Sequence, residues 1–440
     1  MLVTLLPLAL SAPGDAAYAE GVAALKAKNG PDAEAALRRC TDEAPDRADC
    51  LWELGWAHWL QNDWAAVVET WKALQALDAS HGELARYLPQ AEKNLALKQE
   101  LEASAASAPA TFVSTAPEGA TVRLRAVGDM MLGTTFPAGY LPENDGVDIL
   151  DGVADWMADA DLTFANVEGP LCDEGVSRKC APDSTNCYAF KSPTRYGQYF
   201  ADAGVDIAST ANNHSGDFGE TCRRDTETTL DELGIVWSGP PGSIASAEAN
   251  GLKVAMVAFH SSTECNYIND HETAKQLVAK AASTHDIVVV SFHGGAEGSK
   301  ALHVPDEMEL FYGEQRGHLR VFTHEVVDAG ADLVLGHGPH VPRAIEVYKD
   351  RLIAYSLGNF ATYGRFNLSG HLGTGFVLET TMDAEGRFVG GRILSTKQEG
   401  RGVPVKDPDN TAAALVAKLS AEDFPETAIQ VAADGTLAAP

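Results

Sequence analysis

Short apolar runs recur between residues 121 and 400, and each is followed closely by Asp, Glu, Asn or His. Stretches with helical spacing separate these runs, a pattern typical of an α/β domain in which strands and helices alternate. In such folds ligands bind beyond the carboxyl ends of the strands, so polar residues far apart in the sequence can meet in one crevice. The pattern is carried by "TVRLRAVGD", "DLTFANVE", "VDIASTANNH", "LKVAMVAFH", "DIVVVSFHGGAE", "ADLVLGHGPH" and "RLIAYSLGN".

The polar residues at these expected strand ends are oxygen and imidazole ligands. Such ligands suit Mn, Fe, Zn or Mg, and no cysteine thiolate stands among them. The sequence therefore predicts a divalent metal site, holding either one ion or two ions that share a bridging carboxylate.

Each signal also has a plainer explanation. The pair Gly128-Asp129 is an ordinary turn pair, and Asn212 and Asn213 suit a left-handed turn or a helix cap. A histidine such as His260, placed after a buried strand, is more often structural than a ligand. The segment "GHGPH" is more specific, because the Gly and Pro between its histidines favour a loop that presents both rings.

Six motifs in order resemble the poly-γ-glutamate capsule-biosynthesis (CapA-type) family, which is similar to the calcineurin-like metallophosphoesterases. The resemblance covers residues 121–396 and implies a metallophosphatase-like four-layer αββα sandwich, with two sheets face to face and helices outside. It also implies an extracytoplasmic role in making, releasing or anchoring polyglutamate or a similar envelope polymer. The motifs are "RLRAVGDMMLG", "DLTFANVEGPL", "STANNHSGDFG", "VVVSFHGGAE", "LVLGHGPHVPR" and "IAYSLGNF".

The resemblance also implies roles for single residues. Asp129 and Glu168 stand for the family's two carboxylates, and His214 stands where the phosphoesterases protonate the leaving group, so these three residues are the expected catalytic set. The expected metal ligands are Asp129, Asn166, Glu168, Asn213, His293, His337 and His340.

The chain departs from the family pattern at several positions. It reads "HGGAEGS" where the family usually carries an aromatic residue after the histidine and another after the glutamate, which puts the substrate wall there in doubt. Met131 replaces the histidine of an Asp-x-His opening, which weakens the case for a second ion. Gly338 stands where a second consecutive histidine is common, and Arg343 stands where a glutamine is common.

The mechanism that these residues favour is hydrolysis or transfer at an amide or ester of an envelope polymer, with metal-activated water as nucleophile. Two alternatives remain: a phosphoesterase that uses the same site, and a non-catalytic assembly or binding protein. A substrate carboxylate would bind Arg343, Arg365 or Lys191, of which Arg343 is nearest in sequence to His340. The expected substrate-binding residues are Asn212, Glu297, Arg343 and Asn359.

The net charge of -29 argues against a nucleic-acid partner, because phosphate binding requires clustered Lys and Arg. The same charge repels a polyanionic polymer at long range unless a local basic patch dominates.

Composition divides the chain into five segments. Residues 1–16 are signal-like, which predicts export to the periplasm or beyond, and no later segment is apolar enough to span a membrane. Residues 17–100 have helical spacing and are similar to tetratricopeptide repeats, a possible surface for a protein partner, although a plain helical hairpin explains them equally well. Residues 101–120 are a linker by composition, residues 121–400 are the α/β domain, and residues 401–440 are an acidic tail expected to hold one helix and then fray.

Seven cysteines without a CxxC pair favour disulfides in an exported protein. Cys40 and Cys50 flank an expected tight helix connection and are the predicted pair. Four further cysteines lie in one region of the sequence: Cys172, Cys180, Cys187 and Cys222. Because the number of cysteines is odd, one thiol must remain outside a disulfide. If the chain is not exported, scattered buried thiols explain the same residues.

Overall fold

The computed structural model describes residues 12–106, 112–177, 179–180 and 187–440. The chain divides into two compact units, Met1–Glu100 and Leu101–Pro440. Most of the signal-like segment, residues 1–11, lies outside the described residues. Within the described parts, no helix is both long and apolar enough to cross a membrane.

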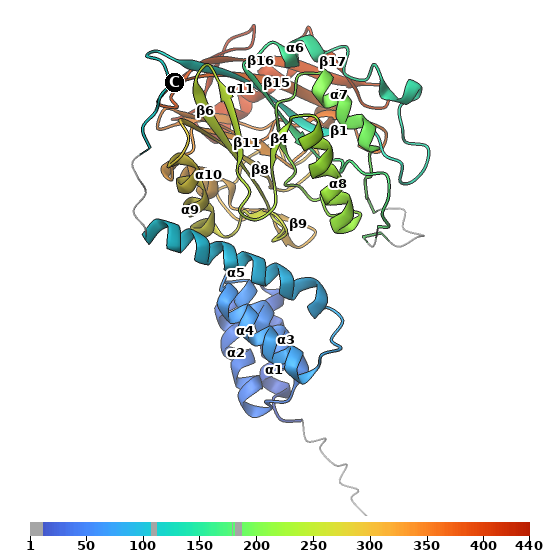
Figure 1. The fold of residues 1–440 in the computed structure, drawn as a ribbon, viewed down its shortest axis with the longest axis vertical. Helices are drawn as coiled ribbons and strands as arrows, with labels where there is room; N and C mark the ends of the chain where they lie inside the picture. The colour runs from blue at the N-terminus through green and yellow to red at the C-terminus, as the bar shows by residue number, and fades with distance from the viewer. Residues whose placement is uncertain (1–11, 107–111, 178, 181–186) are drawn as a thin grey trace, which may run out of the picture. The chain divides into compact units, whose positions relative to one another are not determined.

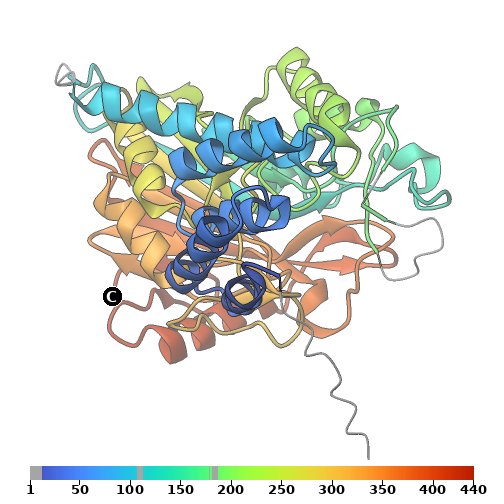
Figure 2. The ribbon, with the colours of Figure 1, turned by 90° about the horizontal axis from the view of Figure 1, so that it is seen from below.

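The first unit is built of helices, shown in blue in Figures 1 and 2. Short connections join its first four helices, and each of these helices packs against the next one in the chain. Asn29 and Asp63 cap two of these helices by accepting hydrogen bonds from backbone amides. The predicted helical region is therefore confirmed, whereas its assignment as tetratricopeptide repeats stays a prediction. The helices are α1 (Asp15–Lys26), α2 (Gly30–Glu43), α3 (Ala48–Trp59) and α4 (Trp64–Leu77).

Helix α5 (Leu84–Ala106) continues into the segment that the composition predicts to be a linker. The prediction is wrong for residues 101–106, because "LEASAA" contains strong helix formers that extend the helix. Residues 107–111 of the expected linker lie outside the described residues.

The described residues include three disulfides. Cys40–Cys50 joins α2 to α3, as predicted. Cys172–Cys222 and Cys180–Cys187 lie in the region where four cysteines crowd together. Cys265 is the remaining thiol and is buried outside a disulfide.

The first sheet of the second unit has the strand order β18-β19-β16-β15-β1-β2-β3-β4, with β14 beside β1 and β17 beside β16. Strands β1 to β4 and β14 pair in parallel, whereas β15 to β19 pair antiparallel. The strands are β1 (Thr121–Met131), β2 (Leu162–Val167), β3 (Ile207–Ser209), β4 (Val236–Ser238), β14 (Asn359–Thr362), β15 (Thr374–Asp383), β16 (Phe388–Glu399), β17 (Val403–Lys406), β18 (Gln430–Val431) and β19 (Thr436–Ala438).

The second sheet has the order β12-β13-β11-β8-β6-β5, with β7 beside β6. Its four central strands are parallel, and its edge strands β12 and β5 are antiparallel. A small hairpin, β9 (Leu310–Phe311) and β10 (Glu314–Gln315), stands apart from it. The strands of the second sheet are β5 (Ala245–Ala249), β6 (Leu252–His260), β7 (Asn266–Tyr267), β8 (Ile287–His293), β11 (Leu333–His337), β12 (Ile345–Tyr348) and β13 (Arg351–Ala354).

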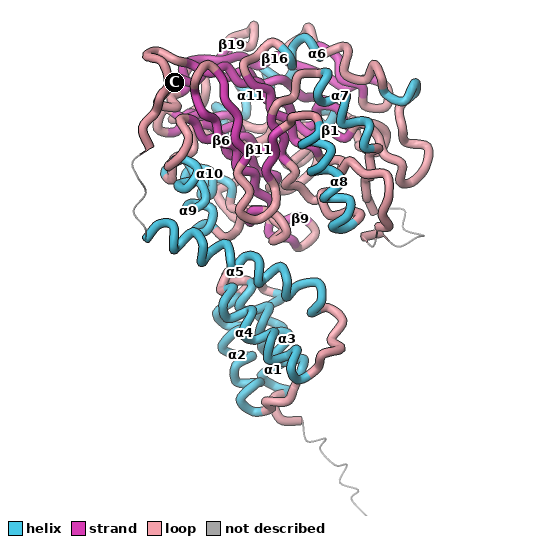
Figure 3. The backbone as a smooth tube through the Cα atoms, in the orientation of Figure 1, coloured by secondary structure: helices cyan, strands magenta, loops and turns pink. Residues whose placement is uncertain are grey.

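The two sheets pack face to face with helices on their outer faces, as the strands and helices of Figure 3 show. Val122 and Leu124 of β1 share one core with Val254 and Met256 of β6, so this core lies between the sheets. Met130 instead packs with α6 (Ala154–Ala158), α7 (Gly197–Asp202) and α8 (Gly219–Glu232) on the outer face of the first sheet. Helices α9 (His271–Ala282) and α10 (Leu319–Asp328) cover the second sheet. The predicted four-layer αββα arrangement is confirmed.

The carboxyl-terminal segment is part of this fold. Helix α11 (Thr411–Asp423) is the single helix expected there, and its Ala412 and Val416 enter the core between the sheets. The expectation that the chain then frays is wrong, because β18 and β19 extend the first sheet and Leu437 is buried in the same core.

Candidate metal centre

Three polar residues of the first sheet lie side by side: Asp129 and Asn166 near the carboxyl ends of β1 and β2, and Asn359 at the start of β14. Asp129 of β1 is in register with Asn166 of β2 on one side and Asn359 of β14 on the other. Gly128 permits this arrangement, because a Cβ there would lie 1.9 Å from the carbonyl oxygen of Gly358. The backbone amide of Asp129 donates a hydrogen bond to that oxygen at 2.9 Å. Close packing of β1 against β14 therefore requires a glycine immediately before Asp129.

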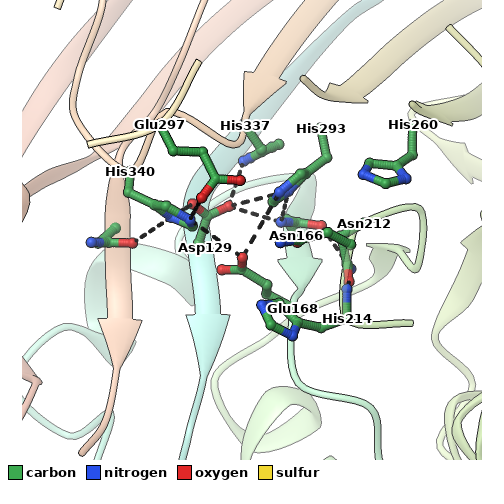
Figure 4. Close-up of polar contacts among 12 residues, drawn as sticks. Asp129, Asn166, Glu168, Asn212, His214, His260, His293, Glu297, His337 and His340 are labelled. Carbon is green, nitrogen blue, oxygen red and sulfur yellow. Dashed lines mark hydrogen bonds and ion pairs between the residues drawn. The ribbon is translucent and has the colours of Figure 1, made fainter. Parts of the chain in front are cut away.

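Three histidines of the second sheet form a matching row. His260 of β6, His293 of β8 and His337 of β11 are in register and buried. Because the sheets face each other, His293 and His337 point toward Asp129, whereas His260 lies farther away in Figure 4. The Nδ1 atom of His260 accepts a hydrogen bond from the amide of Ser262 at 3.0 Å, so a structural role fits this residue.

His340 lies between the two rows. Its Nδ1 is 2.9 Å from Oδ2 of Asp129 and 3.0 Å from Oδ1 of Asn359. Two oxygen acceptors beside Nδ1 place the ring proton there, which leaves Nε2 as the ligand atom. That Nε2 lies 3.7 Å from Oε1 of Glu168 and 3.8 Å from Oε2 of Glu297.

Several buried ligand atoms of the cluster are not hydrogen-bonded. Glu168 is fully buried, yet neither carboxylate oxygen has a hydrogen-bond partner among the described residues. Nε2 of His293 and both ring nitrogens of His337 also lack hydrogen bonds. Buried polar atoms are nearly always paired, so a group of unpaired ligand atoms indicates a place for an ion or water.

The donor set fits a divalent cation. Ligand atoms of Asp129, Glu168 and His340 all lie within 4.8 Å of one another. Nδ1 of His337 lies 3.5 Å from Oδ1 of Asp129, and Nε2 of His293 lies 3.8 Å from Oε1 of Glu168. Ligands at about 2.1 Å from one ion lie roughly 3 to 4 Å from each other, so these spacings match shared coordination.

The charges in the cluster favour a cation. Burial opposes a charge on His340, but the carboxylates of Glu168 and Asp129 outweigh burial and raise the pKa of His340 to about 10. Burial together with the neighbouring Asp129 charge raises the pKa of Glu168 well above its ordinary value. Burial lowers the pKa of His337 to about 4 and that of His293 well below its usual range, which keeps both rings neutral and able to bind an ion.

The "ANNHS" segment joins this cluster through Asn212. The side-chain nitrogen of Asn212 donates to the carbonyl oxygen of Val167 at 2.9 Å, and its oxygen accepts from the amide of His214 at 3.0 Å. Asn212 therefore links the segment to the end of β2, which is a structural role. Asn213 has a buried Oδ1 with no hydrogen-bond partner among the residues described, which makes that oxygen a ligand candidate.

His214 is held by two residues that the sequence analysis did not select. Its Nδ1 lies 2.6 Å from Oδ2 of Asp217, and Nζ of Lys179 donates to Oδ1 of Asp217 at 2.6 Å. The ring packs against Phe190 at 4.2 Å between ring centroids. Asp217 could have been found, because it follows His214 by three residues, whereas Lys179 comes from a distant loop.

Arg343 does not serve as expected. Its guanidinium is fully buried and forms a two-bonded ion pair with Glu309 at 2.9 and 2.8 Å. Its Nε donates to the carbonyl oxygen of Ala301 at 2.6 Å. These partners occupy the guanidinium, so the geometry gives no support to the predicted substrate binding. Asn359 was also expected to bind substrate. Its Oδ1 lies 3.0 Å from Nδ1 of His340 and orients that ring, and its side-chain nitrogen donates to the carbonyl oxygen of Leu372 at 3.0 Å.

Other cations near the motifs are also engaged. Nζ of Lys191 donates to the carbonyl oxygens of Asp173 and Glu174, and the guanidinium of Arg365 packs over the rings of Tyr140 and Tyr188. Glu297, expected to bind substrate, does border the cluster, as Figure 4 shows. Arg316, which the sequence analysis missed, lies 2.9 Å from Glu297 through its Nη2.

Residues 123–363, just over half of the chain, match the family described as "Bacterial capsule synthesis protein PGA_cap". The chain is 26% identical over 264 residues to the "Capsule biosynthesis protein CapA" of Bacillus anthracis, a match that covers 55% of this chain and 60% of that protein. It is 28% identical over 252 residues to the "PGA biosynthesis protein CapA" of Bacillus subtilis, covering 53% and 61%. The chain thus spans less than two thirds of the length of these curated relatives.

Among solved structures, the fold is similar to that of a purple acid phosphatase from yellow lupin (Lupinus luteus) seeds. The TM-score is 0.34 at 11% sequence identity, and the match covers 66% of this chain and 54% of the phosphatase.

Proposed function

The chain belongs to the bacterial capsule synthesis protein PGA_cap family, and from this premise we propose that it is an exported, metal-dependent hydrolase or transferase that acts on an envelope or capsule polymer such as poly-γ-glutamate. The observation that carries the proposal is the buried cluster of Asp129, Glu168 and His340, whose ligand atoms lie together while both oxygens of Glu168 lack partners. A purely structural cluster would leave these desolvated groups uncompensated.

Asp129, Glu168 and His340 would hold the cation, with His293, His337, Asn166 and Asn213 as further ligand candidates. Mn, Fe, Zn and Mg all suit this oxygen and imidazole set, for one ion or two. When bound, a divalent ion would polarise the oxygen of the scissile bond and lower the pKa of a bound water.

The protein groups would supply orientation and proton transfer. Asn359 and Asp129 fix the ring of His340. His214 is the general acid of the proposal: Asp217 occupies its Nδ1, so Nε2 is the atom that can pass a proton to the leaving group. Lys179 in turn fixes Asp217.

The three disulfides support export, because such bonds persist in oxidising compartments and are rare in the cytosol. The capsule functions named for the relatives agree with an envelope location.

A phosphoesterase acting on small phosphate esters is the second candidate. The observation that favours it is the adjacent pair Asn213-His214, with a ligand oxygen on one residue and a carboxylate-oriented imidazole on the next. Mn-dependent hydrolysis of an aryl phosphate, without action on polymers, would favour this candidate.

A non-catalytic assembly or binding role remains the third candidate, with the helical unit recruiting a protein partner. The paired helices α1 to α4 are the observation behind it. Partner binding that survives both Asp129→Ala and His293→Ala would favour this role.

The first test is the metal content of untagged protein purified without chelators, measured by elemental mass spectrometry. We expect one or two ions per chain in the wild type and a loss of metal in Asp129→Ala and His293→Ala. The matched control is His303→Ala, because His303 is 58% exposed and pairs with Asp423, which is not a candidate ligand.

The metal-loaded protein is then incubated with poly-γ-glutamate, and the polymer length is followed by size-exclusion chromatography. Shortening that disappears in Asp129→Ala and persists in His303→Ala supports the proposal. A wild type that holds no stoichiometric metal, even after reconstitution with Mn or Zn, contradicts it.

A further inference from the structure

Arg316 is a buried cation beside the metal centre. It follows the β9–β10 hairpin, and its side chain is 1% exposed. Its backbone oxygen accepts a hydrogen bond at 2.8 Å from the amide of Gly295, two residues after His293. The backbone therefore ties Arg316 to the segment that also carries Glu297.

The guanidinium lies against the turn between His337 and His340. A Cβ at Gly338 would be 3.3 Å from Nη2 of Arg316, so the missing side chain at this position leaves room for the guanidinium. The guanidinium therefore lies beside the segment that joins two histidines of the metal centre.

The donors of this guanidinium are not filled. Nε and Nη2 of Arg316 are buried and have no hydrogen-bond partner within the part of the chain that the structure describes. Glu297 provides an opposite charge 2.9 Å away, but its Oε1 also lacks a hydrogen bond, so the pair is in contact without hydrogen-bond geometry. Nη1 lies 3.7 Å from the exposed carboxylate of Glu314. A buried guanidinium with unfilled donors is costly unless an acceptor joins it.

Four other cations near the motifs are all occupied. Arg343 is paired with Glu309, and Lys179 is bonded to Asp217. Lys191 is bonded to two backbone oxygens and Arg365 lies over aromatic rings. Among these candidates in the described part of the chain, only Arg316 combines burial beside the metal centre with unfilled donors.

We propose that Arg316 binds an oxyanion of the substrate, a carboxylate or a phosphoryl oxygen, next to the metal centre. Glu297 neutralises the guanidinium until that anion enters, and its other oxygen, 3.8 Å from Nε2 of His340, gives it a second polar partner. This inference rests on the proposed function, because it specifies the charge of the group that the centre would receive. The buried Arg316 would also provide a local positive charge for an anion, although the net charge of the whole chain is -29.

The test measures anion binding to metal-loaded protein by isothermal titration calorimetry. The probes are inorganic phosphate, a γ-linked glutamate trimer, and the same trimer with its carboxylates amidated. We expect the wild type to bind at least one of the two anionic probes and not the amidated trimer. Arg316→Gln should weaken that binding by about tenfold or more, the range of a lost charge-assisted pair.

Two further variants separate anion binding from a structural ion pair. Glu297→Gln breaks the same pair from the other side and should bind the anion as tightly as the wild type or more tightly, because the competing carboxylate is gone. Arg125→Gln is the matched control, since it breaks a largely buried pair between Arg125 of β1 and Glu379 of β15 and should leave binding unchanged. Equal weakening in Arg316→Gln and Glu297→Gln would overturn the inference.

Metal content is measured for every variant, and affinities are compared at equal occupancy. If Arg316→Gln fails to fold, Arg316→Lys still tests the idea, because it keeps the charge but loses the forked donors and should bind more weakly. Unchanged affinity in both Arg316 variants would overturn the inference.

The probes show which kind of anion binds. Together with the polymer-cleavage assay, they also separate failure of this inference from failure of the proposed function. Arg316-dependent binding of the trimer identifies a carboxylate, and Arg316-dependent binding of phosphate alone identifies a phosphoryl group; both support the inference. If phosphate binds through Arg316 but no polymer is cleaved, the polymer function fails and the inference stands. If a polymer is cleaved but no anion binds, the inference fails and the function stands.

Discussion

Nδ1 of His340 lies 2.9 Å from Oδ2 of Asp129, so a carboxylate at the end of β1 orients an imidazole supplied by the connection after β11. Asn359 adds a second acceptor at 3.0 Å, and together they direct Nε2 of His340 toward Glu168. Outer partners of this kind fix the tautomer and the angle of a ligand histidine. The affinity of the centre for metal should therefore depend on residues that do not touch the ion.

Asn359→Ala should reduce the affinity for the metal by about 10- to 100-fold, the usual effect of losing an outer hydrogen bond to a ligand histidine. The dissociation constant would be measured by competition with a chelator of known affinity. Asn367→Ala is the control, because Asn367 is exposed and bonds only the nearby amide of Ser369. Equal affinities in the two variants would show that Asn359 does not support the ligand set.

Much of this arrangement could be predicted from the sequence, because parallel strands bring their carboxyl ends to one edge. The register places Asp129 beside Asn166 and Asn359, and it places His293 beside His337. A pattern of apolar runs followed by polar residues therefore predicts which residues lie close together in the fold.

Other parts could not be predicted, since long-range packing decides them. Arg343 is three residues from His340 in sequence, yet His340 has a φ of 62° and the chain turns there, so Arg343 binds Glu309 instead of the site. Arg316 follows a short hairpin with no periodic signal, and nothing in the sequence near it indicates Glu297 as its partner. Residues 430–438 lack the length of a recognisable strand, but β16 offers them a pairing edge.

Asp217→Asn should lower the pKa of His214. Burial lowers this pKa, the negative charge and hydrogen bond of Asp217 raise it, and the positive charge of Lys179 lowers it. Removing the charge of Asp217 removes a contribution that favours the imidazolium, so the titration midpoint moves to lower pH. As the proposed general acid works in its protonated form, the falling alkaline limb of any activity profile should move the same way.

The midpoint of His214 would be followed by NMR of the ring resonances in metal-free protein. Lys179→Gln is the paired variant and should move the midpoint to higher pH, because it removes a positive neighbour. Shifts in the same direction for both variants would contradict this account of the dyad.

Glu309→Gln should destabilise the second unit strongly. Glu309 and Arg343 are both buried and share two hydrogen bonds, so the substitution leaves a buried guanidinium without its counter-charge. Breaking a buried pair in this way costs about 3 to 5 kcal/mol in the free energy of unfolding. Urea denaturation measures the change, and Arg387→Gln, which breaks a pair at the exposed surface, should have little effect. A small loss in Glu309→Gln would contradict a stabilising role for this buried ion pair.

Gly128→Ala should damage both the fold and the metal centre, because the new Cβ would lie 1.9 Å from the carbonyl oxygen of Gly358. Strand β14 must then move away from β1, and this separates Asp129 from Asn359. We expect a loss of about 1 to 3 kcal/mol in the free energy of unfolding of the metal-free protein, as in other overpacked sites, together with weaker metal binding. Gly390→Ala is the matched control: it lies in β16 with no atom within 4 Å of the added Cβ, and it should keep its stability and its metal. If Gly128→Ala is as stable as Gly390→Ala and binds metal equally well, close contact between β1 and β14 is not what holds Asp129 in place.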